Sequence, residues 1–270
     1  MKKLFRINFF GQTTEGTVRK NNEDNFYPNT ALKTPAVRNL GLVADGMGGH
    51  NCGEVASEIA ALQIPYQYKA YKKCGLPKAE ITPDMPYEVS CLKRAVQKAN
   101  DIIYDEARKD RDKIGMGTTA TSLLLLNSTM WFAHVGDSQA YIIRKNIGKN
   151  GASYQQLTED HSLMMEYFKN GWITEADFEN FPQKNIITRA LGVKERVEVD
   201  LGRVEVSNND RFMLTSDGLF KSLTKEQVFG IIDGNRDDAK ACVEIINEAL
   251  SSEKGSPDNI TVVIGTVLPA

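Results

Sequence analysis

Residues 118–144 read TTATSLLLLNSTMWFAHVGDSQAYIIR, and they contain three strand-like segments separated by short polar turns. The turns are Asn127-Ser128 and Gly136-Asp137-Ser138. Neither is long enough for the crossover that parallel strands require, so the three strands must run antiparallel to one another. Other apolar segments with strand-like composition are also predicted strands. They lie at 4–10, 40–44, 154–157, 197–206, 211–215 and 259–267, and Asn150-Gly151 is a further hairpin signal.

The predicted helices fall into two groups and do not alternate with the strands. The first group is 53–62 and 86–109, and the second is 225–233 and 237–251. In 86–109 apolar residues recur every three or four positions, which gives one buried stripe. Thr224 and Gln227 have the spacing of a capping box, and the proline-rich stretch 65–86 is expected to be a surface loop. This order predicts an α+β fold of antiparallel sheets covered by helices.

Composition limits what the chain can be. Its 270 residues allow one domain or two, and 41% hydrophobic and 25% charged residues are ordinary for a globular protein. The 33 Lys and Arg against 35 Asp and Glu give a net charge of −2, which excludes nucleic-acid binding through bulk positive charge. No apolar run approaches the ~20 residues of a membrane helix, and the first residues do not form a secretory signal. The four cysteines lack zinc-site spacing, so we expect free thiols and a cytoplasmic protein without a membrane partner.

Four aspartates stand at the ends of predicted strands. Asp45 directly follows an apolar segment, Asp137 and Asp217 each follow one after a single residue, and Asp258 precedes the last one. Each could be a simple turn residue. If the four gather at one rim, however, they repel: two like charges 4 Å apart cost about 1 kcal/mol in water and about 4 kcal/mol at an effective dielectric of 20. A divalent ion removes that repulsion, and carboxylate oxygens suit Mg²⁺ or Mn²⁺.

These aspartates belong to an ordered series of motifs. In chain order the motifs are Arg19-x-x-Asn22-Glu23-Asp24, Ala44-Asp45-Gly46-Met47-Gly48-Gly49-His50, Gly117-Thr118-Thr119-Ala120, Val135-Gly136-Asp137-Ser138-Gln139-Ala140-Tyr141, Leu157-Thr158-Glu159-Asp160-His161-Ser162, Ile187-Thr188-Arg189-Ala190-Leu191-Gly192, Thr215-Ser216-Asp217-Gly218-Leu219 and Asp258-Asn259-Ile260-Thr261. The series resembles the motifs of the metal-dependent Ser/Thr protein phosphatases of the type 2C class (PPM). A methionine after Asp-Gly, as at Met47, resembles the bacterial branch of that family. The resemblance spans about residues 8–267. It implies one domain over 1–270, in which two stacked antiparallel sheets are flanked by helices as an αββα sandwich.

The resemblance also implies a metal centre at one rim of the sandwich. Asp45 would bridge two core ions, and the carbonyl of Gly46 would serve one of them. Asp217 and Asp258 would hold the other core ion. Asp137 would share Asp217 with a third, weaker ion. The cofactors implied are therefore Mn²⁺ or Mg²⁺, two core ions and a weaker third.

Three further residues have implied roles beside the ions. Glu23 and Asp24 would hold metal-bound waters, and Arg19 would bind the substrate phosphate through a bidentate fork that Lys cannot reproduce. Two ions can activate water for in-line attack on phosphorus, so no protein nucleophile is required. Met47 stands where eukaryotic members carry a His proposed as the acid, and a metal-bound water is the preferred acid here. His50 has no such role transferred to it.

The flap beside the active site corresponds, by resemblance, to about 162–187. Its methionines and aromatic residues are mixed with acids, and we expect most of them to pack the flap onto the sheet, with substrate docking as the alternative. His134 is expected to be a hydrogen-bonded core residue, because it lies within a predicted strand. His161 is a candidate for orienting a loop near the site.

The sequence thus predicts hydrolysis of phosphoserine and phosphothreonine in proteins, opposing a cognate Ser/Thr kinase, by a monomer with no nucleic-acid partner. One alternative is a metal-dependent hydrolase of another phosphoester, such as a nucleotide, but no phosphate-cradling P-loop is present. The other alternative is a catalytically inactive regulatory module on the same fold. Loss of the metal aspartates would indicate such a module, and all of them are present.

Overall fold

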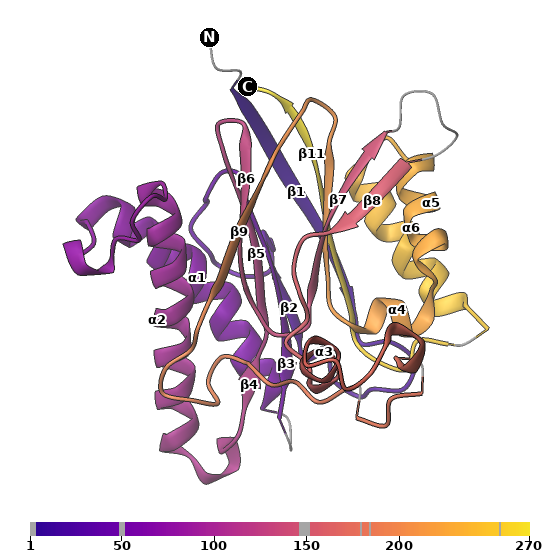
Figure 1. The fold of residues 1–270 in the computed structure, drawn as a ribbon, viewed down its shortest axis with the longest axis horizontal. Coiled ribbons are helices and arrows are strands. Elements are labelled where there is room, and N and C mark those ends of the chain that lie inside the picture. Colours follow the sequence, from indigo (N-terminus) through magenta and orange to yellow (C-terminus); the bar gives the residue numbers. More distant parts are fainter. Residues whose placement is uncertain (1–3, 49–51, 146–151, 179, 184, 254) are drawn as a thin grey trace.

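Two antiparallel β-sheets stacked face to face form the centre of the molecule (Figure 1). The computed structural model describes residues 4–48, 52–145, 152–178, 180–183, 185–253 and 255–270. The first sheet has the order β1 (Phe5–Thr14), β11 (Ile260–Pro269), β10 (Arg211–Thr215), β7 (Gln139–Lys145) and β8 (Ala152–Gln156). The second has the order β2 (Asp24–Tyr27), β3 (Leu40–Met47), β5 (Ala120–Leu126), β6 (Thr129–Val135) and β9 (Asp200–Glu205), and β4 (Gly117–Thr118) also pairs with β3.

Helices cover both outer faces of this sandwich (Figure 1). The second sheet carries α1 (Gly53–Cys74) and α2 (Tyr87–Lys109), and the first sheet carries α4 (Gly218–Ser222), α5 (Lys225–Gly234) and α6 (Asp238–Ser251). The remaining elements are α3 (Leu163–Lys169) and the 3₁₀ turns η1 (Lys78–Glu80), η2 (Arg111–Lys113) and η3 (Glu175–Asp177). Apolar side chains from both sheets, including Phe9, Leu123 and Phe212, meet in a buried layer between them. The predicted αββα sandwich is confirmed.

The prediction of a loop over 65–86 was wrong in its first part, and several short elements, including β2, α3 and α4, were not predicted. The proline-rich stretch begins as helix and not as loop, because α1 continues through Pro65 to Cys74. A proline inside a helix removes one backbone hydrogen bond. Ile64 and Pro65 are buried on the face of α1 that packs against the core, and this burial offsets the lost bond. Strand β2 was not predicted, since it has only four residues and starts with polar ones.

The remaining predictions agree with the structure apart from shifts at element ends. The predicted capping box of Thr224 and Gln227 forms at the start of α5. The hairpin signal Asn150-Gly151 lies outside the described residues, although the strands on either side of it, β7 and β8, do pair antiparallel. In the part of the chain that the structure describes, no helix is both long and apolar enough to cross a membrane.

The strand pairing brings the motif-bearing strand ends to one end of the sandwich. On the first sheet, Thr215 at the end of β10 pairs with Val262 near the start of β11 and with Gln139 at the start of β7. On the second, Asp24 pairs with Asp45 near the end of β3. This shared end, at the bottom of Figure 1 near α3 and α4, is the rim of the sandwich and carries the candidate site.

Candidate metal centre and active site

Strand β3 delivers Asp45 to the rim with its backbone held on both sides. The Asp45 N–H donates to Thr119 Oγ1 at 2.9 Å, and the Asp45 carbonyl accepts from the Thr119 N–H at 2.8 Å and from Thr118 Oγ1 at 2.9 Å. The next residue must be glycine, because a Cβ on Gly46 would lie 2.2 Å from the carbonyl oxygen of Gly53. Burial, and then the charges of neighbouring acids, raise the pKa of Asp45 well above its ordinary value. These acids are Asp24, Asp217, Asp137 and Asp258.

Asp24 lies opposite Asp45 and connects the two sheets. Its Oδ2 accepts hydrogen bonds from Ser216 Oγ at 2.7 Å and from Thr261 Oγ1 at 2.8 Å, and both donors belong to the first sheet or its end. The side chain is only 4% exposed. Burial is the main cause that raises the pKa of Asp24 to about 7. Oδ2 of Asp24 therefore serves to connect the two sheets, and only Oδ1 is available for other contacts at the rim.

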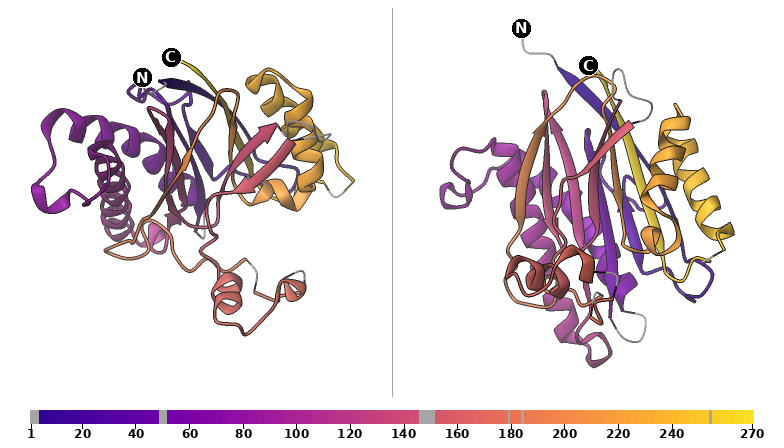
Figure 2. Two further views of the ribbon diagram at one scale, coloured as in Figure 1. Left: turned by 45° about the horizontal axis from the view of Figure 1, so that its top comes forward. Right: turned by 45° about the vertical axis from the view of Figure 1, so that its right-hand side comes forward.

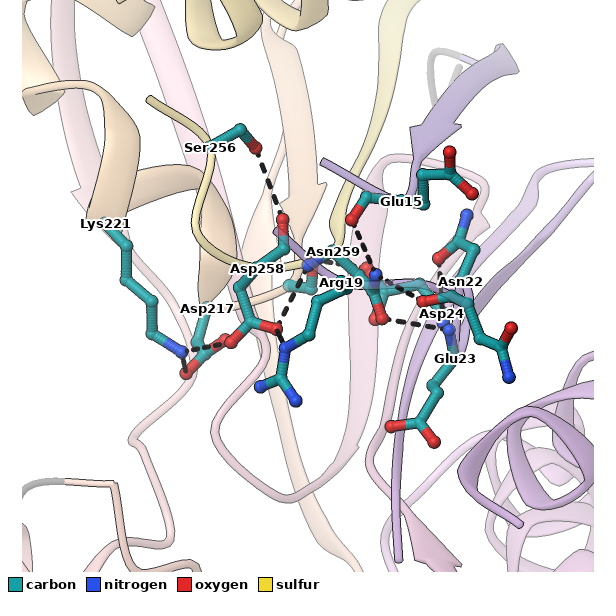
Figure 3. Close-up of polar contacts among 12 residues, drawn as sticks. Glu15, Arg19, Asn22, Glu23, Asp24, Asp217, Lys221, Ser256, Asp258 and Asn259 are labelled. Atoms are coloured by element: carbon teal, nitrogen blue, oxygen red, sulfur yellow. Dashed lines mark hydrogen bonds and ion pairs between the residues drawn. The ribbon is translucent and has the colours of Figure 1, made fainter. Parts of the chain in front are cut away.

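Asp217 and Asp258 share a cation supplied by the chain itself (Figure 3). Lys221 Nζ lies 2.6 Å from Asp217 Oδ2 and 2.8 Å from Asp258 Oδ2. Arg19 Nε lies 2.8 Å from the other oxygen of Asp258, Oδ1. Burial alone would raise the pKa of Asp258, but Lys221 and Arg19 outweigh it and hold that pKa below its usual value.

Asp137 has the opposite environment. It sits in the turn between β6 and β7, where Gly136 adopts a φ of 114° and has Thr119 packed against it. The Asp137 side chain is 8% exposed, and its Oδ1 has no hydrogen-bond partner among the described residues. Burial, and then the charges of Asp217 and Asp160, raise its pKa to about 7. A buried carboxylate oxygen without a donor is costly unless a cation compensates it.

The Asp137 turn is held from behind by a chain of polar contacts. The Gly136 N–H donates to His161 Nδ1 at 2.9 Å, so the ring proton lies on Nε2, 3.1 Å from Asp200 Oδ2. Arg189 Nη1 in turn lies 2.5 Å from Asp200 Oδ1. The prediction that His161 orients a loop near the site agrees with this geometry. Sequence reasoning gave no role to Asp200.

His134 is the core residue that its strand position predicted. It is fully buried, its Nδ1 lies 2.9 Å from Thr121 Oγ1, and its Nε2 lies 2.9 Å from the Glu159 carbonyl. Burial lowers its pKa to about 3, so the ring is neutral. The ring lies 4.6 Å from that of His161. The third histidine, His50, lies outside the described residues.

Asn259 positions the segment that carries Arg19 and Glu23. Its Nδ2 donates to the carbonyls of Glu15 and Asn21 at 3.0 and 2.9 Å, and its Oδ1 accepts from the Glu23 N–H at 2.9 Å. The Glu23 carbonyl then accepts from the Gly46 N–H at 3.0 Å. Burial raises the pKa of the Glu23 carboxyl. Asn259 belongs to the motif Asp258-Asn259-Ile260-Thr261, but its role depends on contacts between segments more than 200 positions apart. The sequence alone does not reveal such contacts.

The 162–187 segment, which was predicted to be a flap, does not pack onto the sheet as expected. Its base is closed by a β-bridge between Ser162 and Ile187, and Figure 2 (left) shows the 162–187 segment projecting away from the sheets. No residue of α3 or η3 is buried. The aromatic rings pair among themselves, as Tyr167 does with Trp172 at 5.0 Å between centroids and Phe168 with Phe178 at 5.2 Å. The flap side chains therefore form their own small cluster instead of packing onto the sheet.

The donor chemistry of the rim fits a hard divalent ion. Within the described ranges, no three His, Cys, Asp or Glu side chains already converge on one point as a ready ion site, since Asp217 and Asp258 hold Lys221 instead. The available donors are nevertheless all oxygen atoms, which a hard divalent ion prefers. A positive charge at the rim would also pair with the free Asp137 Oδ1 and reduce the repulsion among the acids. Mg²⁺ or Mn²⁺ is therefore compatible with these residues.

Comparison with known proteins identifies the class. Residues 10–166 match the protein phosphatase 2C family. The serine/threonine phosphatase stp of Listeria monocytogenes is 35% identical, covering 94% of this chain and 93% of that protein. The protein phosphatase PhpP of Streptococcus pneumoniae is 34% identical, covering 93% and 94%. The chain therefore belongs to the protein phosphatase 2C family.

Solved structures agree with this assignment. The serine/threonine phosphatase PstP/Ppp of Mycobacterium tuberculosis superposes with a TM-score of 0.77 at 30% identity, covering 98% of this chain and 100% of that one. A structure of the PstP catalytic domain in complex with two manganese ions superposes with a TM-score of 0.75, also at 30% identity, covering 98% and 99%. The chain thus has the fold of bacterial phosphatases of this family.

Proposed function

We propose that the rim hydrolyses phosphoserine and phosphothreonine in proteins. The family of the chain and its named relatives make it a protein serine/threonine phosphatase. One observation favours the rim as its active site: Asp45, Asp137, Asp217 and Asp258 lie near one another there, and the Oδ1 of Asp137 is buried with no donor in the described structure. Stability alone does not account for such a cluster, because like charges in a low dielectric destabilise the fold.

The residues proposed to hold two core ions are Asp45, the carbonyl of Gly46, Asp217 and Asp258. Asp137 and Asp217 would hold a weaker third ion. When bound, the ions supply Lewis-acid activation of water and charge neutralisation at phosphorus. The two manganese ions of the PstP structure support Mn²⁺, and Mg²⁺ is proposed on the same oxygen-donor chemistry.

Glu23 and Asp24 are proposed to order waters beside the ions. Asp24 can do so only through Oδ1, because Oδ2 is bound to Ser216 and Thr261. Glu23 has a backbone fixed by Asn259 and a partly buried carboxylate. Both side chains would therefore act at a fixed distance from the rim.

Arg19 is proposed to bind the phosphate of the substrate. Its Nε is bound to Asp258, and Figure 3 shows the two terminal nitrogens pointing away from that carboxylate. The side chain is 53% exposed, so a substrate can reach it. Two parallel N–H donors match two phosphate oxygens, which would orient the phosphorus for in-line attack.

The leaving oxygen needs a proton, and no described imidazole supplies it. Met47 cannot donate one, and both nitrogens of His161 are committed to Gly136 and Asp200. We assign this step to a water ordered beside Asp137. The turns Gly136-Asp137 and Ser216-Asp217 lie close together at the same rim, which supports this proposal.

Around this reaction we propose a single domain over 1–270 with the flap at about 162–187, acting as a cytoplasmic monomer. Its partners would be phosphorylated proteins and a cognate Ser/Thr kinase. The alternatives remain another phosphoesterase or an inactive module. The presence of every rim carboxylate disfavours the inactive module.

Phosphate release tests these proposals directly. The substrates are a phosphothreonine peptide, p-nitrophenyl phosphate and a nucleoside monophosphate, each with Mn²⁺, with Mg²⁺ and with EDTA. Metal-dependent release that is fastest from the peptide is expected. Release from the nucleotide alone would indicate another phosphoesterase, and release in EDTA would contradict the metal centre.

A further inference from the structure

Lys221 is a cation placed inside the carboxylate cluster by the fold itself. It lies on α4, one helical turn after Asp217, so its side chain returns over that carboxylate. Its ammonium bridges Asp217 Oδ2 at 2.6 Å and Asp258 Oδ2 at 2.8 Å. The Lys221 side chain is 32% exposed, and the acceptors are 28% and 19% exposed. This contact is therefore half-buried and joins two elements far apart in the sequence.

The ammonium contacts one oxygen of each carboxylate that is proposed to hold a core ion. Asp217 and Asp258 are the two carboxylates proposed above to hold one core ion together. An ammonium in hydrogen-bonding contact with both carboxylates competes with a divalent ion for their oxygens, and the two positive charges repel each other. Its ion pairs with Asp217 and Asp258 favour the charged form of the ammonium.

The other rim acids lack such a contact. In the described structure no cationic side chain touches Asp45 or Asp137, and Asp137 Oδ1 is buried without a donor. Lys221 therefore makes its direct contacts at the Asp217–Asp258 position.

We propose that Lys221 is a resident counter-ion that occupies the Asp217–Asp258 position in the ion-free protein and must be displaced before a divalent ion binds there. This inference rests on the metal centre proposed above. Lys221 thereby lowers the affinity of this position for a divalent ion. Its positive charge also stabilises the rim carboxylates when no ion is bound.

Calorimetric titration of the ion-free protein with Mn²⁺ tests the inference without measuring activity. Lys221→Gln removes the competing charge, so we expect at least one Mn²⁺ to bind about tenfold or more tighter than in the wild type. Lys221→Arg keeps a cation there and should bind Mn²⁺ no more tightly than the wild type. Lys225→Gln is the matched control, because Lys225 lies over the rings of Tyr141 and Phe220. It should leave Mn²⁺ affinity unchanged.

Thermal unfolding provides the second measurement. In EDTA, Lys221→Gln should unfold at a lower temperature than the wild type, and saturating Mn²⁺ should raise its midpoint more than it raises that of the wild type. Unchanged or weaker Mn²⁺ binding by a folded Lys221→Gln protein would overturn this inference and leave the proposed active site standing. If neither that variant nor the wild type bound Mn²⁺, the metal centre itself would be wrong, and this inference with it.

Discussion

Asp24 and Asp45 face each other directly across β2 and β3, and the pair lies where the two sheets meet. Asp24 is anchored to the first sheet through Ser216 and Thr261, whereas the backbone of Asp45 is held by Thr119 on the second sheet. The distance between the two halves of the rim is therefore set by hydrogen bonds behind the carboxylates. A site built this way can hold its acids in place while they repel one another.

Replacing Asp45 by Asn should abolish most activity without unfolding the protein. The amide keeps the size of the side chain but removes the charge proposed to bridge two ions. We expect turnover of a phosphothreonine peptide in Mn²⁺ to fall about 100-fold or more, with weaker Mn²⁺ binding by calorimetry. The control is Asp233→Asn, which changes an exposed aspartate on α5. Near wild-type turnover of Asp45→Asn would show that the metal assignment is wrong.

Replacing Arg19 should affect the substrate more than the ions. A lost charged hydrogen bond costs about 1.5–3 kcal/mol, so Arg19→Ala should lower kcat/KM for a phosphopeptide by roughly 10- to 100-fold. Arg19→Lys keeps the charge but not the fork, and should recover only a small part of the loss. Mn²⁺ affinity is measured on the same proteins. A large fall in that affinity with unchanged kinetics at saturating Mn²⁺ would contradict the phosphate role.

Asp137→Ala should lower kcat in a way that depends on the leaving group. If Asp137 orders the water that protonates the leaving oxygen, a phosphothreonine peptide should suffer strongly. p-Nitrophenyl phosphate hardly needs protonation and should suffer much less. Steady-state kinetics of one protein on both substrates makes the comparison. Equal losses would rule out the proton-donor role, and no loss on either would make Asp137 a turn residue only.

Ionisation of Asp160 should make the free energy of unfolding depend on pH. Its carboxylate accepts from Gln139 Nε2 at 2.7 Å and Gln156 Nε2 at 2.8 Å, but burial dominates and raises its pKa to about 6 from 3.8. A raised pKa means that the folded state binds the proton more tightly. The contribution of this group to stability is therefore fully present below about pH 4 and is lost as pH rises through 6.

Asp160→Asn should remove this dependence. In ion-free protein, the free energy of unfolding of the variant relative to the wild type should rise by about 2 kcal/mol between pH 4 and pH 7. The absolute difference also contains a part that does not depend on pH, because the amide oxygen of the variant can accept from only one of the two glutamines. Urea unfolding of both proteins at the two pH values measures the change. A constant difference would show that Asp160 ionises normally in the folded protein.

The sequence alone determined the layers of the fold and the family motifs. Short turns such as Asn127-Ser128 leave antiparallel pairing as the only option, and grouped helical stripes then have only the outer faces to cover. The capping box of Thr224 and Gln227 could be predicted because it acts within one helical turn. Such local signals depend on residues close in the chain, so they survive without knowledge of the fold.

Tertiary structure decided the rest, because it depends on contacts between distant segments. Pro65 stays in a helix since burial against the core offsets its missing hydrogen bond. Asn259 holds the Arg19 segment, and Asp200 holds His161, across separations that no local pattern encodes. The sequence alone shows that Lys221 lies four residues after Asp217. Only the meeting of α4 with the start of β11 brings Asp258 to the same ammonium, because two carboxylates can share one cation only when the fold places them on either side of it.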